Sequence, residues 1–428
     1  MNPDPAKKNL REVVAMVVDQ GLFVELACKL GETFGKVYYH CPNWTDAFPR
    51  ANRALIGMGM SNIELAKSML DPEIFDSIDI FIFPDVNFGH EQEFLVSQGK
   101  LVWGSRMGED MELDRPFMKD LMKQSGFPVG GWRTVQGMSK LREYLATNKD
   151  KHVKVSRFRG TFETFKSPNL PYVEPKLDEV EASLGALKDV MEFVVEDDLP
   201  NKVEFGEDMY CIDGVFPTQI IAGPEIKDEG FVGVFKKRSE LPEPLTRFDR
   251  VMAPHLKKFG YRGFYSTEVR IGKDLVPYMI DFCARAASPP NELYQEFYTN
   301  LAEIIWMGAN GVCIDPKPAG RYGAEALIHS SWADTHWQPL TIPDSIKKYV
   351  KLRNAMRIDG KYYTAPQGVS LPEIGAVVGY GNTLQEAIDM VKKVADQVKG
   401  YYIEIKVDAF DRAEQEIAKG EKFGLKIF

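Results

Sequence analysis

The sequence has no long apolar run, no paired cysteines and no excess of basic residues. None of its 428 residues lies in a run of about 18 apolar residues, as a membrane span needs, so we expect no membrane contact. The five cysteines are scattered without a Cys-x-x-Cys pair, which favours reduced thiols and a cytoplasmic location. The six histidines are equally scattered, so a metal site should be built from carboxylates. The net charge of −9 argues against duplex nucleic acid as the main partner.

Two common nucleotide-binding motifs are also absent. No Gly-x-Gly-x-x-Gly follows the first predicted strand, which disfavours a dinucleotide-dependent oxidoreductase. Residues 156–164 do not end in the Gly-Lys-Ser/Thr of a Walker loop, although they include Arg157, Arg159, Gly160 and Thr161. Guanidinium groups and the N–H groups of a glycine turn bind phosphate, so we predict a phosphate-binding loop of another kind.

The first part of the chain alternates between strand and helix patterns. The predicted strands are residues 13–18, 37–39, 80–83 and 101–103, and the predicted helices are residues 23–34, 62–70 and 91–97. This alternation predicts a parallel sheet with helices on both faces. Ligands of such sheets bind at the carboxyl ends of the strands. Later in the chain, residues 293–308 and 177–188 also show helical spacing.

Two carboxylates lie on a predicted hairpin in the second half of the chain. Its strands, residues 264–271 and 276–284, carry Glu268 and Asp281. Antiparallel pairing can bring both carboxylates side by side on one face. Because adjacent carboxylates repel each other unless a proton or cation lies between them, Mg²⁺ bridging ATP phosphates would suit them. From the spacing alone, Glu268 could instead pair with Lys or Arg on a solvated sheet face, and this alternative stays open.

Further polar residues lie in or beside predicted strands. Lys154 lies in the strand 152–155, where a solvated sheet face is the ordinary position for lysine. Glu196 and Asp197 follow an apolar strand whose end could hydrogen-bond an adenine edge, although the local sequence favours a solvated acidic loop. Glu204 could accept hydrogen bonds from ribose hydroxyls.

Several segments occur in the order expected of an ATP-grasp enzyme, and together they resemble the phosphoribosylamine–glycine ligase family. One segment resembles the family's Ser-Lys-x-Phe-x-Lys-x-Phe-Met-Lys, followed by Gly-Ile-Pro; others resemble its Val-Val-Lys strand, its acidic hinge and its Glu-Phe-Asn-x-Arg-x-Gly-Asp-Pro. A Glu-x-x-x-Asp strand and a C-terminal Gly-x-Thr-Leu-x-Glu-Ala are also similar. The matching segments are residues 104–128, 153–154, 194–197, 204–208, 281–289 and 378–387.

The resemblance implies an α/β protein with the ATP-grasp fold. It implies a doubly wound parallel-sheet domain at residues 1–110, an ATP-grasp domain at 111–325 with a small lid at about 152–198, and a small α+β domain at 326–428. It further implies ATP and Mg²⁺ as cofactors and an amide-forming ligase that proceeds through an acyl phosphate, as in purine biosynthesis. Its partners would be small molecules, an amino acid or other carboxylate and an amine. The resemblance leaves both a monomer and a homodimer open.

The resemblance also implies a role for individual residues. The ATP phosphates would be held by Arg115, where the family has Lys, and by Lys154, Arg159, Gly160 and Thr161. Glu196 and Asp197 would contact the adenine, and Glu204 would contact the ribose. Glu268 and Asp281 would bind Mg²⁺, and Arg285 would bind the substrate carboxylate or the acyl phosphate.

The sequence departs from the family on the substrate side. Cys283 replaces an Asn metal ligand, and residues 157–164 replace a Gly-rich lid. Residues 20–26 lack the family's Arg and His, and residues 228–233 only echo its Gly-Pro-Asn-Thr-Gly-Gly-Met-Gly loop. Two alternatives therefore stay open: a ligase acting on another amine, such as a modified nucleotide, and a non-catalytic ATP-binding sensor or scaffold.

Overall fold

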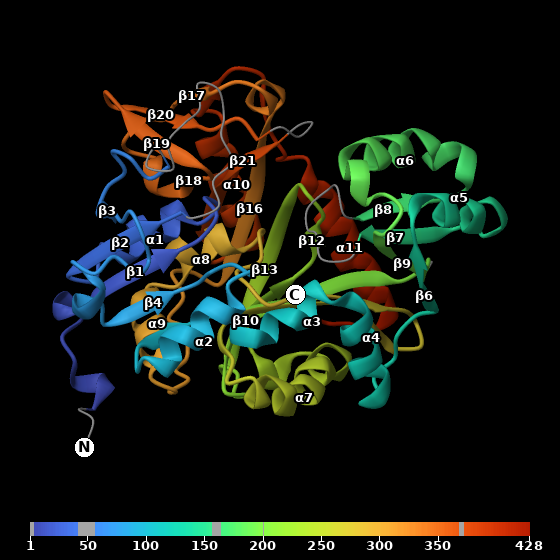
Figure 1. Ribbon diagram of the computed structural model, residues 1–428, viewed down its shortest axis with the longest axis horizontal. Helices are drawn as coiled ribbons and strands as arrows, with labels where there is room; N and C mark the ends of the chain where they lie inside the picture. The colour runs from blue at the N-terminus through green and yellow to red at the C-terminus, as the bar shows by residue number, and fades with distance from the viewer. Residues whose placement is uncertain (1–3, 42–55, 156–163, 200, 368–371) are drawn as a thin grey trace.

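The computed structural model describes residues 4–41, 56–155, 164–199, 201–367 and 372–428. In Figure 1 the N-terminal strands lie at the left, the strands of a long central sheet fill the middle, and a smaller unit with α5 and α6 lies at the right. Among the described residues, no helix combines the length and apolar composition of a membrane-spanning segment.

The N-terminal sheet is parallel throughout, in the order β3-β2-β1-β4-β5. The apolar strands β1 and β4 are almost wholly buried, as expected of parallel strands with helices on their faces. This confirms the predicted parallel sheet. Its elements are β1 (Val14–Val18), α1 (Val24–Leu30), β2 (Lys36–His40), β3 (Glu64–Leu65), β4 (Ile80–Ile82), α2 (Gly89–Ser97) and β5 (Leu101–Trp103).

The helix predicted at residues 62–70 is wrong. The chain forms the edge strand β3 there, with Glu64 paired to Tyr38 of β2. Ile63 and Leu65 both pack against the main core. Their separation of two residues follows the period of a strand, not that of a helix.

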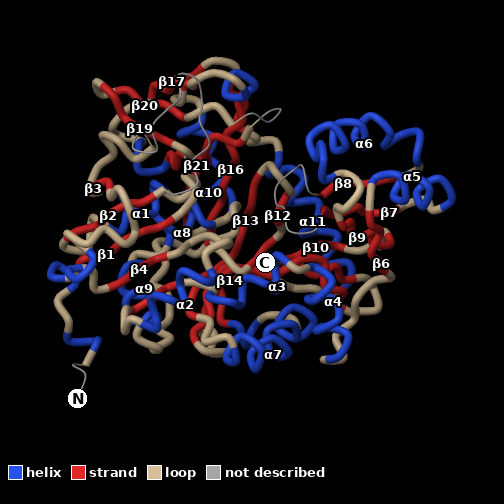
Figure 2. The backbone as a smooth tube through the Cα atoms, viewed as in Figure 1, coloured by secondary structure: helices blue, strands red, loops and turns tan. Residues whose placement is uncertain are grey.

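The central sheet has ten strands. Figure 2 shows its strands in red across the middle of the molecule. Its main order is β15-β14-β10-β11-β13-β16-β21-β18, and β12 pairs with β13 and β23 with β16. The predicted hairpin is confirmed as β14 and β15. The strands are β10 (Val203–Ile212), β11 (Gln219–Gly223), β12 (Glu225–Ile226), β13 (Gly230–Lys237), β14 (Arg262–Ile271), β15 (Pro277–Cys283), β16 (Tyr322–Ser330), β18 (Val350–Leu352), β21 (Glu373–Gly381) and β23 (Ile403–Ile405).

The helices outside the N-terminal sheet and the smaller unit surround this central sheet. They are α3 (Asp110–Leu113), α4 (Arg115–Gln124), α7 (Glu243–Lys258), α8 (Asn291–Phe297), α9 (Leu301–Ala309), α10 (Leu384–Ala395) and α11 (Ala409–Phe423). The prediction of a single helix at residues 293–308 is wrong, because the helix is interrupted between α8 and α9. There Tyr298 forms a β-bridge with Pro318, and the Asn300 side chain hydrogen-bonds to the backbone of Asp315 and Lys317.

The smaller unit is an antiparallel sheet, β6-β9-β7-β8, packed against two helices around its own core. The helix predicted at residues 177–188 begins earlier, because Asn169 caps the backbone N–H of Tyr172 at 3.1 Å and a proline lies in the first turn. The elements are β6 (Trp132–Gln136), α5 (Met138–Thr147), β7 (Lys151–Val155), β8 (Thr164–Ser167), α6 (Leu170–Leu184) and β9 (Glu192–Asp197).

A fourth sheet, in the order β19-β20-β17-β22, lies in the C-terminal part of the chain. Its strands are β17 (Gln338–Thr341), β19 (Ala355–Ile358), β20 (Lys361–Thr364) and β22 (Lys399–Gly400). The strand β16 runs across the predicted boundary at residues 325/326. The predicted domain boundaries stay predictions.

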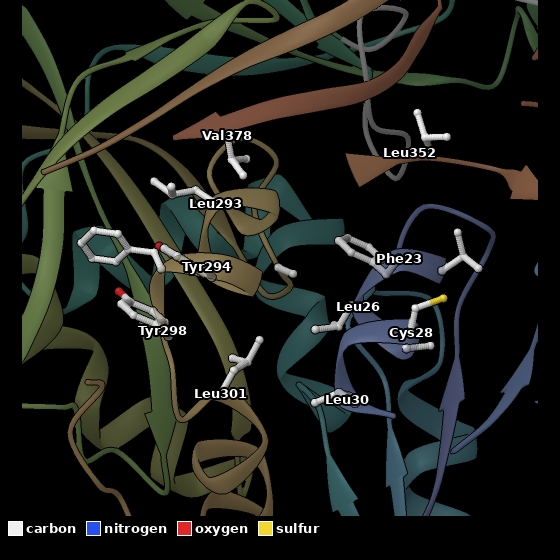
Figure 3. Packing of buried hydrophobic residues seen from close by; sticks show 14 of the residues in the cluster. Phe23, Leu26, Cys28, Leu30, Leu293, Tyr294, Tyr298, Leu301, Leu352 and Val378 are labelled. Atoms are coloured by element: carbon white, nitrogen blue, oxygen red, sulfur yellow. The ribbon is translucent and has the colours of Figure 1, made fainter. Parts of the chain in front are cut away.

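The largest hydrophobic core joins the N-terminal sheet to the central sheet. In Figure 3, Leu26 and Leu30 of α1 lie on the side of that helix that faces Leu293 of α8 and Leu301 of α9. Since α8 follows β15 in the chain, this packing fixes β15 relative to the N-terminal sheet.

Candidate active site

Glu268 and Asp281 lie directly opposite each other on β14 and β15. Both are half-buried, as are Glu204 on β10 and Cys283 on β15, which belong to the same face of the sheet. The predicted juxtaposition of the two carboxylates is confirmed. Their role as metal ligands stays a prediction.

Two buried lysines approach Asp281 from outside the central sheet. Lys154 Nζ, on β7, donates to the carbonyl oxygen of Ile280 at 2.9 Å and lies 3.7 Å from Asp281 Oδ2. Lys119 Nζ, on α4, donates to the carbonyl oxygen of Met279 at 3.5 Å. Lys154 is only 4% exposed, so a solvated sheet face is wrong for this residue.

Glu196 holds these two lysines together. Its Oε1 lies 3.0 Å from Lys119 Nζ and 3.5 Å from Lys154 Nζ. Burial alone would raise the pKa of Glu196, but attraction to Lys154 and Lys119 lowers it. The alternative of a solvated acidic loop is therefore wrong for Glu196. It describes Asp197 better, because that side chain is 53% exposed and pairs with Lys151 at 2.7 Å.

Arg115 supplies a third cation, at the first turn of α4. It is buried, and its Nη1 donates to the carbonyl oxygen of Val155 at 3.3 Å, one residue beyond Lys154. Three cations from α4 and β7 thus gather beside Asp281. Oxygen-rich anions such as phosphates are the ligands that this grouping fits.

The pKa values of the two carboxylates are shifted in opposite directions. Burial alone would raise the pKa of Asp281, but Lys154, Arg115 and Lys119 hold it well below its usual range. Burial, with repulsion from Glu204 and Asp281, raises the pKa of Glu268 to about 8. A divalent cation between the two would relieve the repulsion, so these residues fit a hard metal ion.

The carboxylates would not hold a metal ion unaided. Within the described ranges, no three His, Cys, Asp or Glu side chains are grouped closely enough to bind one. Phosphate oxygens are the ligands that Mg²⁺ commonly adds to one or two carboxylates. The geometry therefore fits a metal ion that arrives together with a nucleotide.

Glu204 pairs with Arg270 on the neighbouring strand. Its Oε2 lies 2.6 Å from Arg270 Nε, and Arg270 Nη1 lies 3.6 Å from Asp198 Oδ1. Glu204 remains half-buried on the face of Glu268. Its ribose-binding role stays a prediction.

Arg285 lies where β15 meets the N-terminal sheet. Its Nε donates to Glu112 Oε1 at 2.8 Å, and the backbone N–H of Ala284 donates to Glu112 Oε2 at 2.6 Å. The backbone N–H of Ala286 donates to the carbonyl of Pro84 at 2.8 Å, just beyond β4. Arg285 is thus placed at the carboxyl end of a parallel strand, where ligands of such sheets bind.

Some residues were predicted but are not described, and others were not predicted at all. Arg159, Gly160 and Thr161 lie outside the described residues. Lys119 had no predicted role, although it ends the Phe-Met-Lys of the family motif, which was a usable signal. Glu112 carried no signal, since its two partners lie far along the chain.

Comparisons with solved structures identify the fold. Over 92% of this chain and 99% of the other, it superimposes on phosphoribosylamine–glycine ligase from Thermotoga maritima with a TM-score of 0.66 and 16% identity. It matches biotin carboxylase from Campylobacter jejuni over 94% of this chain and 95% of the other, with a TM-score of 0.62 and 15% identity. The chain has the ATP-grasp fold.

The ATP-grasp fold recurs in a third similar structure, L-amino acid ligase from Bacillus licheniformis. That match covers 92% of this chain and 99% of the other, with a TM-score of 0.59 and 13% identity. No protein-family model and no curated protein sequence matches the chain. At these identities the likeness establishes the ATP-grasp fold, as the sequence predicted, and function rests on the site.

Proposed function

We propose that the chain is an ATP-dependent carboxylate–amine ligase that forms an amide through an acyl phosphate. The supporting observation is the approach of Lys119 and Lys154 to the β15 backbone just before Asp281, with Glu268 opposite. This arrangement offers cations to a polyphosphate and carboxylates to its metal ion. The fold shared with ligases supports the same proposal.

The chemistry proceeds in two steps. A substrate carboxylate attacks the γ-phosphate of ATP, giving an acyl phosphate and ADP; an amine then attacks the acyl carbon, giving the amide and phosphate. Lys154, Lys119 and Arg115 hold the phosphates in line and neutralise their charge, which is the main protein contribution to phosphoryl transfer. Glu196 positions the two lysines.

Glu268 and Asp281 would hold Mg²⁺, which neutralises phosphate charge when bound. Arg285 holds the substrate carboxylate or the acyl phosphate, and Glu112 fixes its guanidinium group. Glu204 accepts hydrogen bonds from the ribose, while the backbone near Glu196 and Asp197 forms hydrogen bonds with the adenine. The substrates are small molecules, an amino acid or similar carboxylate and an amine.

One observation favours a second candidate, a non-catalytic ATP-binding sensor. Cys283 lies on the site face of β15 where related ligases have an Asn metal ligand, and burial raises the pKa of its thiol well above the usual value. A neutral thiol is a poor ligand for Mg²⁺. Such a sensor would bind ATP without releasing ADP.

The test is ADP release with Mg²⁺ across a panel of amino acids, each with and without phosphoribosylamine. We expect turnover that requires both a carboxylate and an amine. Turnover only with glycine and phosphoribosylamine together would identify a purine-pathway ligase. Turnover with another acid would identify one substrate of a different pair. ATP binding without turnover on any pair would favour the sensor.

The Arg285→Ala variant tests the proposed acyl site. Because a charge-assisted hydrogen bond contributes about 1.5–3 kcal/mol, we expect KM for the carboxylate to rise about tenfold or more, and KM for ATP to change less than about threefold. Arg250→Ala, on the exposed side of α7, is the matched control. Equal changes in both KM values would remove this role from Arg285.

A further inference from the structure

A cavity of about 190 Å³ lies between α1, α8 and β18, and none of its lining residues belongs to the candidate active site. Four lysines line it: Lys29 on α1, Lys347 and Lys348 on the 3₁₀ helix η9 (Lys347–Tyr349), and Lys351 on β18. A water molecule takes up about 30 Å³ in the liquid, so the cavity has room for a small polyatomic ion.

Three glutamates of the lining neutralise these lysines only in part. Glu25 Oε1 lies 2.7 Å from Lys347 Nζ, and Glu296 Oε1 lies 2.8 Å from Lys351 Nζ and 3.3 Å from Lys29 Nζ. The third glutamate, Glu32, also pairs with Lys29, at 2.8 Å. The cavity therefore carries four positive and three negative charges.

Lys348 carries the surplus charge. Lys348 is exposed, and in the part of the chain that the structure describes no carboxylate lies within ion-pair distance of it, although Glu296 attracts it from farther away. Its Nζ lies 4.6 Å from the centre of the Tyr349 ring. Two of the paired groups, Lys351 and Glu25, are 4% and 6% exposed. Since buried charges are costly unless they are compensated, an anion that entered the cavity would find Lys351 already desolvated and held in place, with the partly exposed Lys29 and Lys347 beside it.

A second ion pair connects the cavity to the active-site side of α8. Lys351 and Arg353 are two residues apart, and they bind Glu296 and Glu292, which are one helical turn apart on α8. Arg353 Nε lies 2.9 Å from Glu292 Oε1, and its Nη2 donates to Ser288 Oγ. Ser288 lies three residues beyond Arg285, so α8 joins the two sites physically.

We propose that this lysine cavity binds a small anion with at least two negative charges, a phosphate or a dicarboxylate, and that its binding is transmitted through Glu296 and α8 to residues 285–292. The anion competes with Glu296 for Lys29 and Lys351. It thereby weakens the pairing of α8 with β18, and the segment that carries Arg285 moves together with α8.

The first measurement is thermal unfolding of the full chain with inorganic phosphate, malonate or chloride at constant ionic strength. We expect saturable stabilisation at millimolar concentration by phosphate or malonate and none by chloride. Phosphate alone would identify a phosphate-bearing ligand, and malonate alone a dicarboxylate. Equal effects of all three anions, or no saturation, would overturn the proposal.

Variants are needed to distinguish binding in the lysine cavity from binding beside Lys154, where phosphate could also bind. We expect Lys348→Gln to weaken the apparent affinity at least about threefold, since it removes the unpaired charge. The matched control Lys258→Gln, an exposed lysine at the end of α7, should leave it unchanged. The same affinity in Lys348→Gln and wild type, with loss in Lys154→Met, would assign the anion to the active site and overturn the proposal.

Hydrogen exchange tests the transmission. At saturating anion we expect amide exchange in residues 285–297 to become about threefold faster in wild type, and the same increase in Lys348→Gln should need an anion concentration at least about threefold higher. Unchanged exchange of this segment in wild type, despite saturable binding, would overturn the transmission to α8.

Discussion

The strands β10 and β14 carry carboxylates on both faces, and the faces differ in what the chain places opposite them. On the back face, Asp249 of α7 binds Arg238 Nη2 at 2.5 Å and accepts a hydrogen bond from Tyr265 at 2.9 Å. Glu207 lies beside them, 3.8 Å from Arg238 Nε. Burial, with repulsion from Asp249, raises the pKa of Glu207 well above its usual value. The back face is therefore closed and supplied with its own cation.

The front face is more exposed, and its cations lie beside only one of the two opposed carboxylates. Glu268 and Asp281 are half-buried, and within the described ranges no lysine or arginine forms an ion pair with Glu268. The cations nearby are grouped beside Asp281, where they would face phosphates. The comparison teaches that buried carboxylates alone do not mark a site; an accessible carboxylate without an ion-pair partner, such as Glu268, does.

The largest expected effect is on the front face. The substitution Asp281→Asn removes a metal-facing charge, so we expect Mg²⁺-dependent ADP release to fall about a thousandfold or more while the circular dichroism spectrum is retained. The matched control is Asp274→Asn in the exposed turn of the same hairpin, which should keep its activity. An active Asp281→Asn enzyme would remove the metal role from this residue.

The corresponding change on the back face should act on stability. The substitution Asp249→Asn removes a buried carboxylate and leaves the half-buried Arg238 with one charged partner fewer, so we expect the free energy of unfolding to fall by about 3 kcal/mol in urea denaturation. ATP affinity of the folded protein should change less than about twofold. A stable protein with weakened ATP binding would reverse the distinction between the faces.

The smallest effect is on pH dependence. Because the pKa of Glu268 is raised to about 8, the free carboxyl group holds a proton at pH 7 that Mg²⁺ must displace. Affinity for Mg²⁺ with ADP bound, measured by calorimetry, should rise about fivefold from pH 7 to 8 and about twofold from pH 8 to 9. The rise should disappear in Glu268→Gln; its persistence there would assign the proton to another group.

The sequence predicted those parts of the site that depend on local pairing. A short turn between two apolar strands was enough to place Glu268 opposite Asp281, because hairpin register is set by nearby residues. Motif order likewise predicted the ATP-grasp fold. The metal and nucleotide roles of these residues remain predictions.

Contacts between distant segments could not be predicted in the same way. The burial of Lys154 depends on Glu196 and on the β15 backbone, and neither is near it in the chain. Lysine is ordinarily exposed, so the sequence favoured the wrong environment. The pairing of Arg285 with Glu112 and the interruption between α8 and α9 depend on tertiary packing in the same way.

The position of α11 and the residues after it has a consequence for biosynthesis. Leu425 and Ile427 lie in the same core as Phe205 and Val269 of β10 and β14, and Lys419 Nζ donates to the carbonyl of Lys202. A ribosome releases these residues long after β10 and β14. The core behind the candidate active site is therefore completed only after residues 425–427 have left the ribosome, so a nascent chain that already contains β10 and β14 should still lack part of that core.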